Sequence, residues 1–288
     1  MIKSYLILNY NSYNDVVVLV NRIIEFDNLS PIVVVDNKST EGFNSQYLES
    51  LSDNVHTIQS SENKGYACGN NLGLKFISKK FNPDYVFICN PDVVIEKCHV
   101  ERMIENIRLD KEYAISSLQM KNEDGMLQVS AWKLPTLWDD IVISSAILNR
   151  LFSNPLIYTK DESIVDVVQG AFFVADFEAF QEVGFFDERT FLYGEERLLA
   201  YKMKQLGKKS YFDSTLSFIH QVGGSINKTY SNKYKKFRLV VDGRRIYHKH
   251  YIGNQSNLYV FELAMKLISL EKIIIDGLIW LKNKYAKN

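Results

Sequence analysis

The sequence predicts an α/β protein built on a mixed, mostly parallel sheet, followed by a helical extension. In the first third of the chain, short apolar runs alternate with helical patterns, and after residue 226 the composition becomes strongly basic. Strands and helices in alternation form right-handed βαβ units, which make parallel sheets. We therefore expect an α/β unit over residues 1–226 and a helical segment over 227–288.

The strands expected in the first third are short and rich in β-branched or aromatic residues. They are Tyr5–Leu8, Ile32–Val35, Val55–Ile58 and Tyr85–Cys89. The spacing of apolar residues between them predicts helices over Asp15–Phe26, Phe43–Leu51 and Leu72–Lys80. Ligands of open α/β sheets bind beyond the carboxyl ends of the strands, so we expect the site there.

The region from Ala114 to Asp166 is less regular. We expect a hairpin near Met126–Trp132, and Gly207 is well placed to end the last predicted helix. The remaining helices are predicted over Leu137–Leu151, Phe177–Val183 and Gly194–Leu206, and the remaining strands over Val165–Val174 and Leu216–His220.

The composition excludes several classes of protein. Lys plus Arg and Asp plus Glu both number 34, so no overall charge favours nucleic acid as a partner. Three cysteines without a CxxC pair argue against a disulfide framework or structural zinc and fit a reducing cytoplasm. Neither a signal-peptide pattern nor an uninterrupted apolar span is present, which predicts a cytoplasmic protein, soluble or peripheral at the inner face of the membrane.

The helical segment begins with a basic run from Lys228 to His250 and continues with apolar residues at helical spacing from Leu258 to Leu281. Such a helix packs against the α/β unit, pairs two subunits as a homodimer, or lies on an anionic membrane surface. Amphipathic helices are usually core elements, so packing or dimerisation is the first expectation and peripheral membrane contact the second.

Two aspartates follow predicted strands. Asp92, in Asn90-Pro91-Asp92, could hold a divalent cation that stabilises charge on a departing diphosphate, or it could simply belong to a turn. Asp36 could accept hydrogen bonds from a nucleobase or ribose, or only organise its own loop.

The segment from Asn63 to Asn71 joins a strand to a helix. Gly65 and Gly69 would let a ligand approach the backbone, and the asparagine side chains could bind sugar or phosphate oxygens. An ordinary loop rich in glycine and asparagine is the alternative. The segment matches neither the dinucleotide-binding nor the P-loop pattern.

Glu195 and Glu196 open a predicted helix, where the helix dipole favours acids. Alternatively, one of them faces an acceptor hydroxyl as general base. His220 ends a short predicted strand and is either a structural residue or a metal ligand through its neutral imidazole.

Taken in order, these motifs resemble glycosyltransferase family 2, particularly its rhamnosyltransferase-like branch. The ordered set, rather than any single motif, carries the resemblance. It comprises Tyr10-Asn11, Val34–Ser39, Asn63-x-Gly65-Tyr66-Ala67-x-Gly69-x-Asn71, Asn90-Pro91-Asp92, Gly170-Ala171-Phe172, Val183–Glu188, Tyr193-Gly194-Glu195-Glu196, and His220 with Gly223, Gly224 and Ser225.

The resemblance implies a GT-A fold and a metal-dependent, inverting transfer of a sugar. The donor would be dTDP-rhamnose or a UDP-hexose, and the acceptor a hydroxyl of a polysaccharide or lipid-linked glycan. It also implies that Asp92 and His220 hold Mg²⁺ or Mn²⁺ and that Glu196 is the base, with Glu195 as the second candidate. The implied donor-binding residues are Tyr10, Asn11, Asp36, Asn63, Gly65, Asn71, Asn90 and Asp92.

Two residues depart from the family pattern. Glu196 stands where the family usually has Asp, and Asn90 stands where many relatives have Asp. With one carboxylate fewer, metal affinity without donor is expected to be weak. The changed base leaves a rival hypothesis, a non-catalytic sugar-nucleotide or glycan-binding protein. A nucleotidyltransferase is disfavoured because the first strand ends in Asn9-Tyr10-Asn11-Ser12, not in a glycine-rich basic loop.

Overall fold

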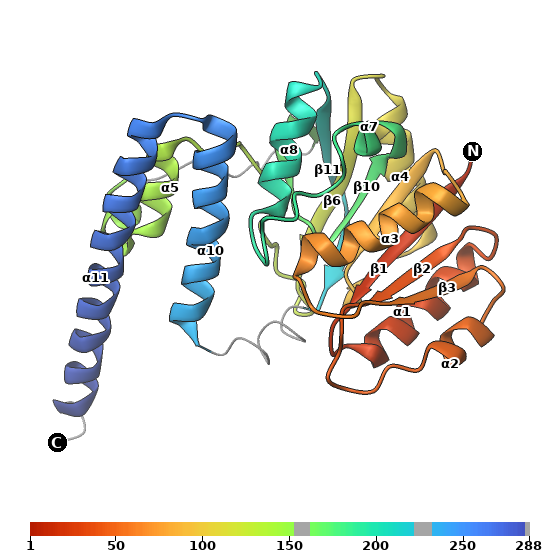
Figure 1. Ribbon diagram of the computed structural model, residues 1–288, viewed down its shortest axis with the longest axis horizontal. Coiled ribbons are helices and arrows are strands. Elements are labelled where there is room, and N and C mark those ends of the chain that lie inside the picture. The colour runs from red at the N-terminus through yellow and green to blue at the C-terminus, as the bar shows by residue number, and fades with distance from the viewer. Residues whose placement is uncertain (153–161, 222–231, 286–288) are drawn as a thin grey trace.

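A mixed sheet of nine strands runs through the α/β part of the computed structural model, which describes residues 1–152, 162–221 and 232–285 (Figure 1). The strands follow the order β3-β2-β1-β4-β10-β6-β11-β5, and β8 pairs with β11. Their bounds are β1 (Lys3–Asn9), β2 (Ile32–Asp36), β3 (Val55–Gln59), β4 (Tyr85–Cys89), β5 (Val93–Val94), β6 (Tyr113–Lys121), β8 (Glu162–Val165), β10 (Phe172–Asp176) and β11 (Lys209–His220).

The strand directions bring several chain segments to one edge of the sheet. Strands β1 to β4 are parallel, and β6 and β11 run the same way because β10 is antiparallel to both β4 and β6. The carboxyl ends of β1, β2, β4 and β11 therefore share an edge with the beginning of β10. The predicted α/β class and the mixed, mostly parallel sheet are confirmed.

Helices cover both faces of this sheet. Alternate residues of a strand point to opposite faces, so Tyr5 and Ile7 pack in one core, and Leu6 and Leu8 pack in the other. The first face is covered by α1 (Tyr13–Phe26), α2 (Ser45–Ser50) and α4 (Lys97–Arg108). The second is covered by α3 (Tyr66–Lys80), α7 (Phe177–Glu182) and α8 (Glu195–Gln205).

A group of helices lies to one side of the sheet, next to α8 (Figure 1). It consists of α5 (Leu137–Ser144), α6 (Ala146–Leu151), α10 (Lys233–Tyr247), the π-helix η1 (His248–Ile252) and α11 (Gln255–Tyr285). These helices share a small apolar core formed by Ile141, Val241, Phe261, Met265 and Ile268. The predicted C-terminal helices are therefore present, whereas the predicted boundary at residue 226 lies outside the described residues.

The backbone of α10 packs closely on the turn before α8. A Cβ at Gly243 would lie 2.3 Å from the carbonyl oxygen of Tyr193. Only a glycine allows this approach, so the helical group is joined directly to the turn that leads into Glu195 and Glu196.

Four predicted elements are wrong in extent. Helix α3 begins at Tyr66, six residues before the predicted helix Leu72–Lys80, and β11 begins at Lys209, seven residues before the predicted strand Leu216–His220. The helix predicted over Leu137–Leu151 is two helices, because Ser145 has an extended backbone and its hydroxyl caps α6 by accepting from the Leu148 amide. The strand predicted over Val165–Val174 is interrupted as well. Its first part includes β9 (Val167–Val168), which pairs with β7 (Ala131–Trp132) in a separate ribbon, while β10 lies in the main sheet.

The segment predicted as a hairpin near Met126–Trp132 folds back on the end of β6. The Asn122 amide donates to Met126, and Lys121 forms an antiparallel bridge with Leu127. Helix α4 and strand β6 have no counterpart among the predicted elements. Within the described ranges, no helix combines the length and the apolar character needed to cross a membrane.

Candidate active site

Asp36, at the carboxyl end of β2, is only 6% exposed and organises the loops around it. Its Oδ1 accepts from Asn9 Nδ2 at 2.9 Å and from the Ser39 hydroxyl at 2.5 Å. Asn11 has φ +56°, and its side-chain oxygen accepts from the amides of Thr40 and Glu41. These contacts match the loop-organising alternative for Asp36 and fix the ends of β1 and β2 side by side.

Gly65 makes room for the chain's own backbone. It has φ +96°, and a Cβ there would lie 2.1 Å from the carbonyl oxygen of Phe191. Asn63 Oδ1 accepts from the Gly65 amide at 2.9 Å and from Asn37 Nδ2 at 3.1 Å. The space beside Gly65, where a ligand was expected to approach the backbone, is therefore filled by Phe191 in the loop that precedes Glu195 and Glu196.

Asn71 also holds that loop. Its amide group donates to the carbonyl of Phe186 at 2.9 Å and accepts from the Phe186 amide at 3.0 Å. The side chain is 2% exposed. Both ends of Asn71 are thus engaged in the fold, and we give it a structural role and leave it out of the proposed site.

Asp92 and His220 come together from distant parts of the chain. Asp92 follows β4, His220 ends β11, and Asp92 Oδ1 lies 3.0 Å from His220 Nε2. Both side chains are mostly buried but reach the surface, with 17% and 14% exposed. Pairing of His220 with Val93 fixes this geometry.

This pair suits a divalent cation. Neighbouring ligands of an octahedral cation at about 2.1 Å lie about 3.0 Å apart, close to the Asp92–His220 separation. A carboxylate with an imidazole suits Mn²⁺ better than Mg²⁺, which prefers oxygen ligands. In the described part of the chain no cluster of three His, Cys, Asp or Glu residues is placed to hold a metal. The remaining ligands would have to come from a bound diphosphate and from water.

The two glutamates at the start of α8 are exposed to different degrees. Glu195 is 3% exposed, whereas Glu196 is partly exposed. The Glu196 carboxylate lies against the backbone of Gly170, and the backbone groups of Glu196 itself, Gly170 and Gly194 stabilise its charged form. A Cβ at Gly170 would lie 2.8 Å from Glu196 Oε1, so this glycine makes room for the carboxylate.

Burial raises the pKa of both glutamates. For Glu195 burial is the main cause and the nearby charge of Glu196 adds to it; for Glu196 those backbone groups and Arg197 partly offset the effect. A carboxylate with a raised pKa is a stronger base near neutral pH. Because a base must also reach its substrate, the partly exposed Glu196 is the better placed of the two.

Hydrogen bonds join these parts through the residues that precede β10. Tyr66, the first residue of α3, donates its hydroxyl to the carbonyl of Gly170 at 2.9 Å. The Asn90 amide donates to Ala171 at 2.8 Å. The hydrogen-bond partner of Asn90, Ala171, directly follows Gly170, which contacts Glu196. Because Asn90 also lies two residues before Asp92, it links the surroundings of Glu196 to those of Asp92. Tyr10 and Asn90, both partly exposed, immediately follow β1 and β4 at the same edge.

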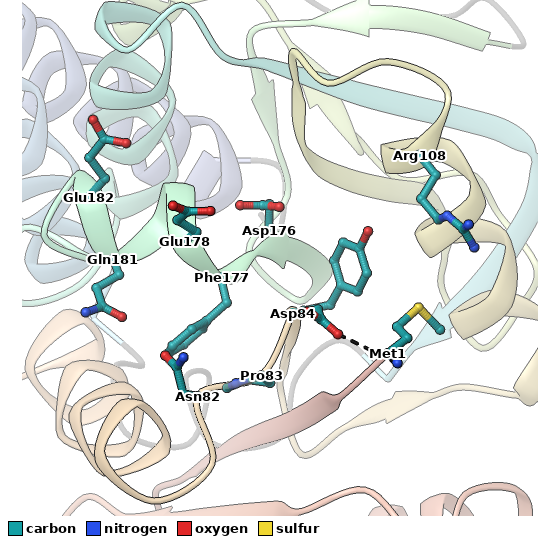
Figure 2. A pocket seen from close by; sticks show the side chains of 11 residues that line it. Met1, Asn82, Pro83, Asp84, Arg108, Asp176, Phe177, Glu178, Gln181 and Glu182 are labelled. Atoms are coloured by element: carbon teal, nitrogen blue, oxygen red, sulfur yellow. Dashed lines mark ion pairs between the residues drawn. The ribbon is translucent and has the colours of Figure 1, made fainter.

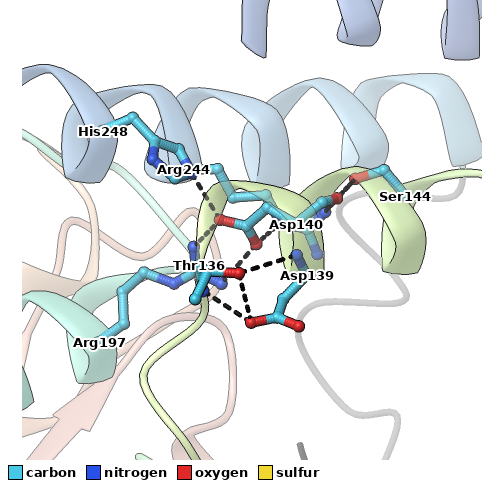
Figure 3. Close-up of polar contacts among 7 residues, drawn as sticks. All are labelled: Thr136, Asp139, Asp140, Ser144, Arg197, Arg244 and His248. Atoms are coloured by element: carbon cyan, nitrogen blue, oxygen red, sulfur yellow. Dashed lines mark hydrogen bonds and ion pairs between the residues drawn. The ribbon is translucent and has the colours of Figure 1, made fainter. Parts of the chain in front are cut away.

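A buried cluster behind Glu196 has no counterpart in the sequence analysis. Asp140, on α5, has a fully buried side chain that is bound by Arg197, Arg244 and His248 (Figure 3). Arg197 donates to both carboxylate oxygens, at 2.8 and 3.1 Å, and His248 Nε2 lies 2.8 Å from Oδ2. Since Arg197 follows Glu196 in the chain, the cluster ties the C-terminal helices to the first turn of α8.

A cavity of about 930 Å³ lies at the opposite edge of the sheet (Figure 2). Its lining includes Met1 and Asp84, at the amino ends of β1 and β4, and Asp176, at the end of the antiparallel β10. Ligands of this type of sheet bind beyond the carboxyl ends of the parallel strands. We therefore leave this cavity out of the candidate site.

Most of the chain matches the model of a known protein family. Residues 4–184 match the family model described as "Glycosyl transferase family 2". The chain belongs to glycosyltransferase family 2. The match includes Asp36 and Asp92 but ends before Glu195, Glu196 and His220, so the roles of these three rest on geometry.

Two curated relatives are similar over most of this chain. The low-salt glycan biosynthesis hexosyltransferase Agl10 of Haloferax volcanii is 28% identical over 204 residues, which make up 70% of this chain and 61% of the relative. The rhamnosyltransferase WbbL of Escherichia coli is 24% identical over 198 residues, 67% of this chain and 74% of the relative. The chain thus spans less than two thirds of the hexosyltransferase.

Solved structures share the fold. GalNAc-T7 with UDP, GalNAc and Mn²⁺ has a TM-score of 0.60 at 16% identity, covering 91% of this chain and 53% of that one. The mannosyltransferase PcManGT from Pyrobaculum calidifontis, in complex with GDP-Man and Mn²⁺, has a TM-score of 0.53 at 14% identity, covering 97% and 79%. The GT-A fold implied by the sequence resemblance is confirmed.

Proposed function

We propose that this family 2 chain transfers a sugar from a nucleotide-diphosphate donor to an acceptor hydroxyl, with inversion and with the help of a divalent cation. The observation that carries the proposal is the placement of Asp92, His220 and Glu196 at one edge of the sheet. The names of the hexosyltransferase and rhamnosyltransferase relatives support a hexose or rhamnose donor. The acceptor would be a polysaccharide or a lipid-linked glycan.

Asp92 and His220 would hold the cation together with the donor's diphosphate. Bound Mn²⁺ or Mg²⁺ would neutralise negative charge on the leaving diphosphate. The side chain of Asn90, two residues from Asp92, is proposed to contact the donor. Tyr10, Asn11 and the loop held by Asp36 are proposed to surround the nucleoside, because they form the neighbouring strand ends.

Glu196 is proposed to take the proton from the acceptor hydroxyl as that oxygen attacks the anomeric carbon. Attack from the face opposite the leaving diphosphate inverts the anomeric configuration in one displacement. The contact with the backbone of Gly170 fixes the direction of the carboxylate, and fixed orientation is a large part of such catalysis. Glu195 is the second candidate, but its burial leaves little access to an acceptor.

Transfer from radiolabelled sugar nucleotides, assayed with Mn²⁺ and with EDTA, tests the proposal. We expect Glu196→Gln to lower turnover by about a hundredfold or more while donor binding is kept, since a positioned base contributes about 10²–10⁴-fold. Glu182→Gln, an exposed acid on α7, is the matched control and should leave turnover unchanged.

Normal turnover of Glu196→Gln would remove this residue from the base role, and full activity in EDTA would remove the metal. Donor binding by the wild-type chain with neither transfer nor hydrolysis would favour a non-catalytic binding protein instead.

A further inference from the structure

Helix α11 carries a row of apolar side chains that face away from the rest of the chain. In the structure each is between 42% and 61% exposed, whereas Phe261, Met265 and Ile268 of the same helix are buried. The row consists of Val260, Leu263, Leu267, Leu270, Ile274, Leu278 and Leu281. Exposed apolar side chains in a continuous patch mark an interaction surface.

The spacing of the row places it on one side of the helix. At about 100° per residue, its members fall within an arc of about 80°, on the side opposite the buried residues. From Val260 to Leu281 the row is about 30 Å long at 1.5 Å per residue. Helix α11 also forms the outer boundary of the molecule, with α10 between it and α8 (Figure 1).

The apolar surface is wider than this row. Beyond Leu270 the helix also exposes Ile273, Ile279 and Trp280 on its other sides. Next to it, Ile147 of α6 is 54% exposed, and its amide donates to Glu271 of α11 at 3.0 Å. The surface therefore extends from α11 onto α6.

At the border of this surface, three exposed lysines outnumber one acid, Glu271. Each acid of α11 is bound by the chain itself: Glu262 by Arg245, Glu271 by Ser145 and the Ile147 amide, and Asp276 by Lys233 and Tyr234. In contrast, Lys266, Lys282 and Lys284 are exposed and border the apolar row. The surface thus has an apolar centre and a basic margin.

We propose that α11 binds the surface of an anionic lipid membrane, with its axis in the plane of the interface. Apolar side chains on one face and lysines beside them are typical of interfacial helices, and anionic headgroups complement the lysines. The spacing would also suit a helix pair between two copies. In such a pair, six lysines would border one interface, while the α11 acids already have partners within their own chain. Repulsion among these lysines disfavours the pair, and attraction to anionic headgroups favours the membrane.

Flotation with vesicles tests this proposal independently of sugar transfer. We expect the whole chain to float with vesicles of phosphatidylcholine and phosphatidylglycerol, and much less with pure phosphatidylcholine. The double variant Leu267→Glu/Leu270→Glu should lower the partition coefficient tenfold or more. The matched control is Leu29→Glu/Leu109→Glu, which changes two leucines that are 82% and 65% exposed elsewhere and should float like the wild type.

A second set of variants, Lys266→Gln, Lys282→Gln and Lys284→Gln, tests the lysines without touching the apolar row. Each substitution should lower the partition coefficient for anionic vesicles about fivefold, and a higher salt concentration should also lower that of the wild type. These variants keep the proposal testable if the glutamate pair disturbs folding, which circular dichroism would show.

Two results would overturn the proposal. One is a wild-type chain that does not float with anionic vesicles. The other is a lipid-free dimer in sedimentation that Leu267→Glu/Leu270→Glu dissociates while vesicle binding is unaffected. Because neither measurement involves sugar transfer, failure here would leave the proposed reaction standing, and failure of the reaction would leave this proposal standing.

Discussion

Replacing Asp140 with asparagine should destabilise the protein strongly, because the carboxylate is the shared counter-charge of a buried cluster. The Asp140 side chain is 0% exposed, and those of Arg197 and Arg244 are 11% and 13% exposed. Asparagine keeps the shape but leaves both guanidinium groups without their buried partner. Breaking a buried ion pair costs about 3–5 kcal/mol. At about 2 °C per kcal/mol for a chain of this size, the melting temperature should fall by about 6–10 °C.

The pH dependence of this effect has a definite sign. Burial alone would raise the pKa of the Asp140 carboxyl. The neighbouring Arg197, His248 and Arg244 outweigh this effect and together hold that pKa well below its usual value. The stabilisation is therefore present at pH values above the ordinary carboxyl pKa and is lost only as the pH falls through the lowered one. The Asp140 carboxyl itself therefore contributes no pH dependence to the difference between wild type and Asp140→Asn from about pH 5 to pH 8.

Thermal unfolding followed by circular dichroism measures both effects. Glu112→Gln is the control, because the Lys209–Glu112 pair is about half exposed and contributes about 0–1 kcal/mol. A melting temperature of Asp140→Asn equal to that of Glu112→Gln would refute the role of the cluster.

Three further predictions concern the loops and the glutamate pair. Gly65→Ala should lower the free energy of unfolding by about 1–3 kcal/mol in urea, whereas Gly42→Ala, with open space around it, should not; equal effects would contradict the steric argument. Gly170→Ala should displace the Glu196 carboxylate and lower turnover tenfold or more, and unchanged turnover would count against that contact. Burial, and then the charge of Glu196, raises the pKa of Glu195 from 4.5 to about 8, so wild-type stability should fall as the pH rises through this window. This dependence of stability on pH has a slope of up to about 1.4 kcal/mol per pH unit, and Glu195→Gln should abolish it. Melting temperatures that change with pH in the same way in both proteins would contradict the prediction.

The order of strands and helices in the first third was predictable because each strand is a compact apolar run. Strand β6 was not predicted, since Ser116 and Ser117 interrupt its apolar pattern. Both are fully buried, and Ser117 donates to the Phe172 carbonyl in the neighbouring strand. The helix α4 did carry a signal, because Val100, Met103, Ile104 and Ile107 have helical spacing and are buried.

The site was predictable where its residues follow strands. Asp92 and His220 lie in contact because β4 and β11 end at the same edge. The cluster around Asp140 was beyond prediction, since its partners are 57, 104 and 108 residues away and a single aspartate in an apolar helix does not identify them. Gly65 shows the same limit: the sequence gives the glycine, but only the fold shows that Phe191 lies against it.

The cation site can be tested most directly by titrating Mn²⁺ and following its electron paramagnetic resonance signal, with and without UDP or dTDP. If Asp92 and His220 share the cation with a diphosphate, the nucleotide should tighten Mn²⁺ binding at least tenfold in the wild type. That gain should disappear in Asp92→Asn and in His220→Ala. Equal Mn²⁺ binding in all three proteins, or no effect of the nucleotide, would contradict the proposed site.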